Sequence, residues 1–212
     1  MKRSILLSVL IIGAVAALVG AGSWATFSDT ETSANNIVST GSLNLKVGTT
    51  TGGAANCNYA DPWTGPLFSL TNAAPGDSDE VTICLKNDGS LKGDLSTTFS
   101  NFENVEVGAC AEPESSAGDT TCNNGDPGEL AQFVNVVIWA DDNCDNVQDS
   151  GEHVFFNGTA AGLPSATIPS FPYTPGTVNC VGTKATVGSN ADNTAQTDKV
   201  EIDVNFTLTQ AP

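Results

Sequence analysis

Basic residues are scarce in this chain of 212 residues, and the scarcity argues against one class of partner. Seven Lys and Arg stand against 24 Asp and Glu, which gives a formal net charge of −17. A surface of this sign repels phosphate groups, so we expect no nucleic-acid partner. The same charge attracts divalent cations and favours solubility.

The residues and motifs of common enzymes are also missing. His153 is the only histidine and no two cysteines have the CxxC spacing, so a zinc site lacks its usual ligands. HExxH, GxSxG and P-loop motifs are absent, which removes the commonest hydrolase and nucleotide-binding sites. Carboxylates are numerous enough for a paired-carboxylate glycosidase, but nothing in their spacing indicates one. We therefore expect a protein that is not an enzyme, with a secreted hydrolase as the least favoured function.

No long amphipathic helix pattern is present, whereas strand patterns recur. Apolar residues alternate with polar ones from Val200 to Leu208, as is typical of a strand with one buried face. The nearly continuous apolar run at 133–139 predicts a buried central strand that ends in a core tryptophan, Trp139. Two further alternating segments lie at 43–47 and 81–86. We expect an all-β fold, a jelly-roll-like β-sandwich, with long loops at residues 48–66, 108–128 and 157–182.

The first 25 residues have the pattern of a secretory signal helix. Lys2 and Arg3 precede an apolar run over 5–19, and the small residues Ser23 and Ala25 then form a cleavage site. We expect removal of residues 1–25 and export of the rest; an uncleaved membrane anchor is the alternative, because the apolar run is barely long enough to span a bilayer. In an exported chain, an even number of cysteines predicts three disulfides that tether the loops. Local spacing suggests only the pair Cys110–Cys122; the six cysteines are Cys57, Cys84, Cys110, Cys122, Cys144 and Cys180.

The sharpest motif is the acidic segment DDNCDNVQDSGE at residues 141–152, which matches a twelve-residue calcium loop. Asn146 occupies position six in place of glycine and tolerates the left-handed conformation required there. Cys144, at position four, is placed to pin the loop by a disulfide. No helix pattern flanks the segment, so we predict a structural calcium site between strands; the alternative is a solvated acidic turn. The expected ligands are Asp141, Asn143, Asp145, Val147 through its carbonyl, Asp149 and Glu152.

Two sequons suit N-glycosylation of an exported protein. They are Asn157-Gly158-Thr159 and Asn205-Phe206-Thr207. The second lies on the polar face of the last predicted strand, where a glycan is compatible with the fold. Chance sequons are common, so unmodified asparagine is the alternative at both positions.

Three blocks of the sequence resemble the TasA/camelysin family of exported biofilm fibre proteins. The first is GSWATFSDTETSANNIVSTGSLNLKV, around the cleavage site. The others are NAAPGDSDEVTICLKNDGSLKGDL, with a Pro-Gly-Asp turn before a strand, and the closing strand VEIDVNFTLTQ. The acidic loop is similar to loops in archaeal and bacterial relatives. The cysteines depart from the bacterial pattern, and the protease label given to part of the family is not carried over, because no metalloprotease ligands are recognisable.

The resemblance implies a jelly-roll subunit, residues 41–212, that polymerises by donor-strand complementation at the cell surface. Segment 26–40 would leave its own subunit and pair with the next one, giving a head-to-tail homopolymer with neighbouring filaments or surface matrix as further partners. The alternatives are that 26–40 closes its own sheet, and that the protein is a calcium-stabilised surface adhesion module. The donor residues expected are Thr26, Phe27, Ser28, Asp29, Ile37 and Val38.

Overall fold

The computed structural model describes residues 39–50, 52–66 and 68–211. The compact unit that begins at Thr40 contains all the secondary structure described below. The expected signal segment 1–25 and the expected donor residues between Thr26 and Val38 lie outside the described residues. Within the described part of the chain, no helix is long and apolar enough to cross a membrane.

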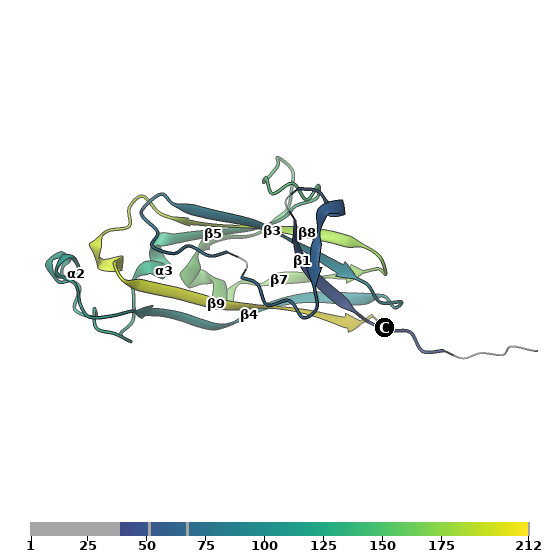
Figure 1. The fold of residues 1–212 in the computed structure, drawn as a ribbon, viewed down its shortest axis with the longest axis horizontal. Helices are drawn as coiled ribbons and strands as arrows, with labels where there is room; N and C mark the ends of the chain where they lie inside the picture. The colour runs from purple at the N-terminus through teal and green to yellow at the C-terminus, as the bar shows by residue number, and fades with distance from the viewer. Residues whose placement is uncertain (1–38, 51, 67, 212) are drawn as a thin grey trace, which may run out of the picture. The chain divides into compact units, whose positions relative to one another are not determined.

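Two antiparallel sheets form the two layers of the fold (Figure 1). The larger has the strand order β2-β1-β3-β8-β5-β6, and the smaller has the order β7-β4-β9. The larger sheet consists of β1 (Leu45–Thr50), β2 (Asn58–Ala60), β3 (Ser78–Asn87), β5 (Val134–Ala140), β6 (Val154–Thr159) and β8 (Val178–Val187). The smaller sheet consists of β4 (Gly93–Glu106), β7 (Ile168–Tyr173) and β9 (Asp198–Gln210).

Helices are short in the described chain and lie outside the sheets. They are α2 (Glu112–Ala117), α3 (Leu130–Phe133), η1 (Ala54–Asn56), η2 (Ala160–Ser165) and η3 (Asn193–Ala195). The predicted all-β sandwich is therefore confirmed at the level of two antiparallel sheets, and its jelly-roll connectivity remains a prediction.

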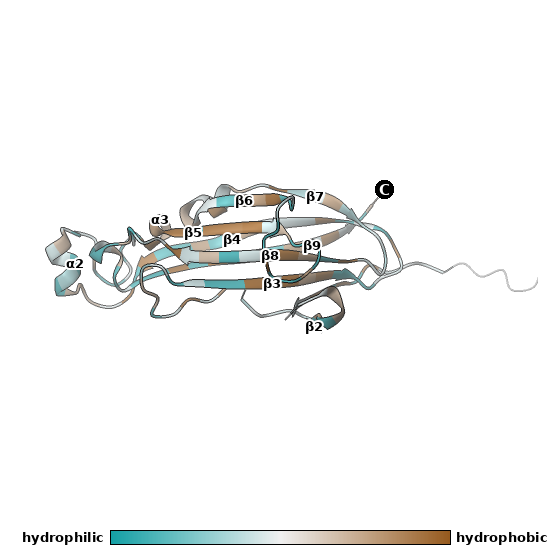
Figure 2. Ribbon diagram, turned by 90° about the horizontal axis from the view of Figure 1, so that it is seen from above, coloured by the Kyte–Doolittle hydropathy of each residue, from teal (hydrophilic) through white to brown (hydrophobic). Residues whose placement is uncertain are grey.

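Apolar side chains between the two sheets form the core. Ile83 and Leu85 of β3 and Leu95 of β4 are fully buried there, together with Val136 of β5. Figure 2 shows the hydrophobic stretch of β5 and parts of β3 and β8 in brown. Tyr173 of β7 is also fully buried, and its hydroxyl donates a hydrogen bond to the Leu85 carbonyl at 2.8 Å. The side chain of buried Asn87 in β3 also donates a hydrogen bond to the Tyr173 carbonyl at 3.1 Å, so two polar contacts tie the smaller sheet to the larger one.

Trp139 is a core residue, as the sequence predicts, but it lies on the outer face of the larger sheet. It is 1% exposed. Side chains alternate between the two faces along β5, so Trp139 points away from the core while its neighbour Ile138 points into it. A Cβ atom at Gly182 of β8 would come 2.1 Å from the indole Cε2 atom. Glycine is therefore required at 182 to let the indole lie against the strand.

Two of the three predicted long loops contain more regular structure than expected, and the third is interrupted by a short helix. Residues 157–182 include η2, β7 and the first half of β8, so the loop prediction there is wrong. Pro169 and Pro172 lie within β7, which is an edge strand, where missing amide donors are tolerated. The segment 48–66 includes the end of β1 and all of β2, and 108–128 contains α2.

Three disulfides tether the loops, as the cysteine count predicts. Cys110 pairs with Cys122, as their spacing suggests, across 12 residues of the loop that carries α2. The other two pairs, which the sequence left open, are Cys57–Cys84 and Cys144–Cys180. Three disulfides indicate an oxidising, extracellular environment.

Candidate functional site

The acidic loop connects β5 to β6 and packs on the outer face of the larger sheet. Asp141 is fully buried. Its Oδ2 accepts hydrogen bonds from the Thr82 hydroxyl of β3 at 2.6 Å and from the backbone amide of Asn146 at 3.0 Å. Cys144 is bonded to Cys180 of β8, which confirms that this position pins the loop. The loop is thus anchored to two strands of the larger sheet.

The backbone of this loop takes the left-handed conformation at two residues, Cys144 and Asn146. Asn146 has φ 67°, the left-handed conformation predicted for position six. The Asp145 amide donates to Asp141 Oδ1 and to Asn143 Oδ1, both at 3.1 Å. The Val147 amide in turn donates to Asp145 Oδ1 at 2.9 Å. Successive side-chain oxygens therefore already face the inside of the turn.

The ends of the loop are held by Glu152, at position twelve. Its two carboxylate oxygens accept hydrogen bonds from the amides of Asp142, at 2.9 Å, and Asp149, at 2.8 Å. The side-chain nitrogen Nδ2 of Asn143 lies between two carboxylates, 3.0 Å from Asp145 Oδ2 and 3.1 Å from Asp149 Oδ2. A donor group thus lies between carboxylates that would otherwise repel each other.

The structure brings the expected ligands into one turn but does not draw their carboxylates to a single point. Among the described residues, the acidic groups of 141–152 do not form a set of three with ligand atoms within 4.8 Å of one another. The hard oxygen donors and the turn geometry fit calcium. Closing around an ion would require Glu152 and the Asn143 amide to turn toward it. Val147, whose carbonyl is the expected seventh-position ligand, has an exposed side chain.

A second candidate feature is the free edge of the smaller sheet at β9. This strand has 13 residues, and within the described chain its ladder pairs only with β4. Its inward apolar row, which includes Val204 and Phe206, is only partly buried. At the opposite edge, β7 carries two prolines, which block the addition of a strand, whereas β9 has none.

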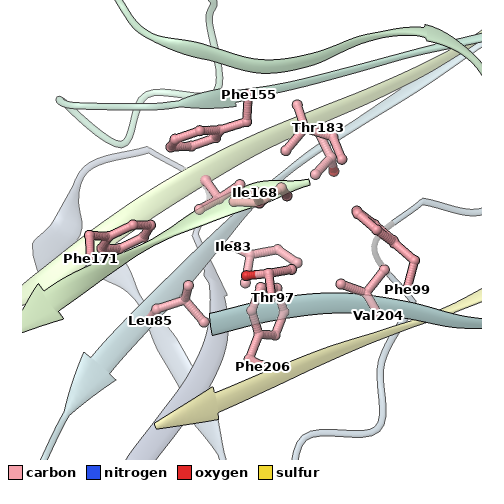
Figure 3. Close-up of a pocket in the computed structure, with 12 residues that line it drawn as sticks. Ile83, Leu85, Thr97, Phe99, Phe155, Ile168, Phe171, Thr183, Val204 and Phe206 are labelled. Carbon is pink, nitrogen blue, oxygen red and sulfur yellow. The ribbon is translucent and has the colours of Figure 1, made fainter. Parts of the chain in front are cut away.

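An apolar cleft lies between the sheets behind this edge (Figure 3). It leaves about 20 Å³ of space for water-sized molecules. Phe99 of β4, Phe171 of β7 and Phe206 of β9 contribute side chains from the smaller sheet, and the larger sheet contributes residues such as Ile83. The space left between these side chains is little more than that of one water molecule, so the two sheets pack closely here.

The side of the sandwich next to β3 is partly covered by the segment between β2 and β3. Trp63, Phe68 and Leu70 of this segment pack against the core. The segment does not extend the β9 ladder, since β9 pairs only with β4 in the described chain. The opposite side is closed by Phe155 of β6 stacked on Phe171 of β7, with ring centroids 6.3 Å apart. Because β9 pairs only with β4, the backbone groups on its outer side have no strand partner among the described residues.

A third feature, which the sequence did not predict, is a cluster of acidic residues where β4 ends and β9 begins. Glu106 and Glu114 are buried, and Asp119, Glu129 and Asp198 are half-buried. Burial first, and then the nearby carboxyls led by Asp198, together raise the pKa of Glu106 to about 8. Burial likewise raises the pKa of Glu129, with Asp119 and Asp198 adding to it. The members come from positions 106 to 198, so no local motif could reveal them.

Both sequons lie on exposed strand positions. Asn157 is exposed on β6, an edge strand of the larger sheet. Asn205 is exposed on the outer face of β9, where its amide donates a hydrogen bond to the Ser100 hydroxyl at 2.8 Å. Their glycosylation remains a prediction.

No protein-family model matches the chain, and no curated protein matches it either. The resemblance to exported fibre proteins therefore depends on the three sequence blocks alone.

Proposed function

We propose that this chain is the structural subunit of an extracellular fibre of the TasA type, which polymerises by donor-strand complementation at the cell surface. The observation that carries the proposal is the open edge of β9. It is a long, proline-free edge strand whose inward row of apolar residues is only partly covered. Exposed edges of this kind are templates for pairing with another chain.

A donated strand would meet two needs of this edge at once. Its backbone would pair with the outer side of β9, and its apolar side chains would cover the row that contains Val204 and Phe206 and part of the cleft behind it. Segment 26–40 contains Phe27, Ile37 and Val38 among polar residues and no proline. It is slightly longer than the 13 residues of β9, so the two strands could pair along most of their length.

The place where this segment joins the sandwich favours donation to a neighbour. The Ser42 carbonyl accepts hydrogen bonds from the amides of Ser90 and Leu91, just before β4 begins. The first residue of β4, Gly93, pairs with Gln210 at the end of β9. The donor segment therefore joins the sandwich at the end where β9 finishes. A subunit that gives a strand at this end and receives one along β9 forms a heterologous contact, which builds an open filament.

Calcium has a structural role in this proposal. An ion held by the loop of residues 141–152 would neutralise its carboxylates and fix the loop on the outer face of the larger sheet. The chain's acidity, with a net charge of −17, favours such neutralisation. No catalytic role is assigned to any residue.

The test is electron microscopy of the mature protein, starting at Thr26, concentrated with calcium. We expect regular filaments from this chain and monomers from a chain that lacks residues 26–40. Phe27→Asp should also prevent assembly, whereas Thr30→Asp, which introduces the same charge at a polar position of the same segment, should not. A synthetic peptide of residues 26–40 should raise the melting temperature of the shortened chain, and a scrambled peptide should not.

The contrary results point to a different function. If the mature chain stays monomeric, and the peptide leaves the shortened chain unchanged, strand donation by this segment is wrong. A calcium-stabilised surface adhesion module would then be the better description. That function predicts retained binding to glycan or matrix after the deletion. Turnover of casein or glycan that a single carboxylate substitution abolishes would instead indicate a hydrolase.

A further inference from the structure

The acidic cluster at the junction of β4 and β9 has the organisation of a metal-ligand set. Glu106, the last residue of β4, pairs in register with Asp198, the first residue of β9. Glu129 immediately precedes α3, and Asp119 follows α2 in the loop closed by Cys110–Cys122. Four carboxylates from separate parts of the chain thus meet at one end of the sandwich.

Each of these four carboxylates has one oxygen held by a hydrogen bond and one buried oxygen without a partner in the described structure. Asp198 Oδ2 accepts from the amides of Glu129 and Leu130 at 2.6 and 2.7 Å. Thr121 holds one oxygen of Asp119 and one of Glu129, and Thr197 holds Glu106 Oε2 at 3.4 Å. The unpartnered atoms are Glu106 Oε1, Asp119 Oδ2, Glu129 Oε2 and Asp198 Oδ1.

Burial makes these free oxygens costly. Glu106 is 1% exposed, so water cannot satisfy its Oε1 from the surface. No Lys or Arg among the described residues forms an ion pair with the four carboxylates; the ion pairs that the structure contains involve other acids. A buried group of negative charges without a positive partner is strongly destabilising unless a cation or protons neutralise it.

The oxygens of three of these carboxylates lie close enough together to contact one calcium ion. One ligand atom each from Glu106, Glu129 and Asp198 lies within 4.8 Å of the other two. Ligand oxygens lie about 2.4 Å from calcium, so two of them on opposite sides of the ion are about 4.8 Å apart. The set offers only hard oxygen donors, which excludes the ligands that zinc prefers, and a buried carboxylate cage suits calcium better than magnesium, which retains several waters.

Gly128 leaves room for this arrangement. A Cβ atom at residue 128 would come 2.6 Å from Asp198 Oδ1, one of the unpartnered oxygens. The Gly128 amide and carbonyl are both bonded to Asn104 of β4. The backbone is therefore fixed against the cluster, and a side chain at residue 128 would force the Asp198 carboxylate to shift.

We propose that Glu106, Glu129 and Asp198 bind a calcium ion, with Asp119 supplying a further carboxylate, at a second site separate from the loop of residues 141–152. The ion ties the loop between β4 and α3 to the end of the sandwich. It replaces the positive charge that the chain itself does not provide there.

The experiment is a calorimetric calcium titration of the mature protein after dialysis against a chelator. Glu152→Gln is present throughout, so that the loop of residues 141–152 does not contribute. We expect this chain to bind one calcium ion. Adding Glu106→Gln should weaken the binding about tenfold or more. Adding Glu112→Gln should leave it unchanged, because Glu112 is an exposed acid of α2 outside the cluster.

Melting temperatures provide a second readout whose sign depends on calcium. Glu106→Gln removes a buried negative charge, so it should raise the melting temperature in chelator and lower it, relative to its parent, in calcium. Gly128→Ala keeps every carboxylate but intrudes on Asp198 Oδ1, and it should also weaken calcium binding. If Glu106→Gln binds calcium as its parent does, or raises the melting temperature equally with and without calcium, the cluster shares protons instead and the proposal is wrong.

Discussion

Cys84 of β3 and Cys180 of β8 lie directly opposite each other, with their sulfur atoms 3.8 Å apart, yet each forms its disulfide with a different loop. Cys84 holds Cys57, beyond η1, and Cys180 holds Cys144 in the acidic loop. The Gly53 amide also donates a hydrogen bond to the Cys144 carbonyl at 2.5 Å. The two strands therefore fasten two neighbouring loops to one place on the larger sheet.

Removing the disulfide of the acidic loop should weaken both stability and calcium binding. In Cys144→Ser/Cys180→Ser, the closed loop of 36 residues is released, which should cost about 2–4 kcal/mol of unfolding free energy. Calcium affinity should fall because the ligands are no longer held in a turn. Urea denaturation and calcium titration measure the two effects. The control is Cys57→Ser/Cys84→Ser, which should lose stability while keeping its calcium affinity. An equal loss of calcium affinity in both variants would show that the Cys144–Cys180 disulfide does not hold the ligands in place.

Calcium should stabilise the protein through Glu152. The wild-type chain should melt at a higher temperature in calcium than in chelator, and a site filled at about 100 times its Kd contributes about 2.7 kcal/mol. Glu152→Gln should lose one bound ion and most of that site's share of the shift. Asp142→Asn removes the same charge from the same loop, but position two is not a ligand position. Differential scanning fluorimetry measures the shift in melting temperature that calcium causes in each variant. An equal shift in Glu152→Gln and Asp142→Asn would exclude a calcium site formed by Glu152.

The strands that could be predicted are those whose burial follows a simple local pattern. β9 alternates from Val200 to Leu208 because only one of its faces packs against the core. β4 was missed because its sequence, GDLSTTFSNFENVE, is largely polar and its few apolar residues do not alternate regularly along the strand. β8 was missed because Gly182 and Lys184 interrupt its apolar residues, although it lies between β3 and β5. Its identity as a strand depends on neighbours far away in the sequence.

The candidate sites differ in the same way. The acidic loop is contiguous, so its turn at Asn146 and its pinning by Cys144 could be predicted from spacing alone. The cluster around Glu106 could not, because its members lie in separate segments and only the pairing of β4 with β9 brings Glu106 to Asp198. The open edge of β9 is likewise a property of strand order. β9 is the outermost strand of a sheet of three strands, whereas the facing sheet has six.

Gly182 should be intolerant of the smallest side chain. In Gly182→Ala, the added methyl group would come 2.1 Å from the Trp139 ring, so the indole or the strand must move. Overpacking of this kind costs about 1–3 kcal/mol of unfolding free energy. The control is Gly162→Ala, where a Cβ would lie 3.5 Å from the Phe156 ring, an ordinary contact. Urea denaturation measures both; a Gly182→Ala variant as stable as Gly162→Ala would show that Trp139 does not lie against β8 as described.

Asp88 should give the protein a stability that is lost in strong acid. Its carboxylate lies 2.9 Å from the Lys46 ammonium and 2.6 Å from that of Lys86, and these contacts, Lys86 first, lower the pKa of Asp88 to about 2. Lys46 and Lys86 are directly opposite each other on β1 and β3, so without Asp88 the two ammonium groups would repel.

The sign of the pH effect follows from the lowered pKa. The ionised form of Asp88 is favoured in the folded state, so its contribution is present above its unfolded pKa, near 3.8, and is lost as the pH falls toward 2. At pH 6, the melting temperature of the wild-type protein should therefore be higher than that of Asp88→Asn. This difference in melting temperature should disappear as the pH is lowered to 2. In a Lys46→Gln/Lys86→Gln background, Asp88→Asn should have little effect at either pH. A gap that stays constant down to pH 2 would mean that the two lysines do not hold the carboxylate in solution.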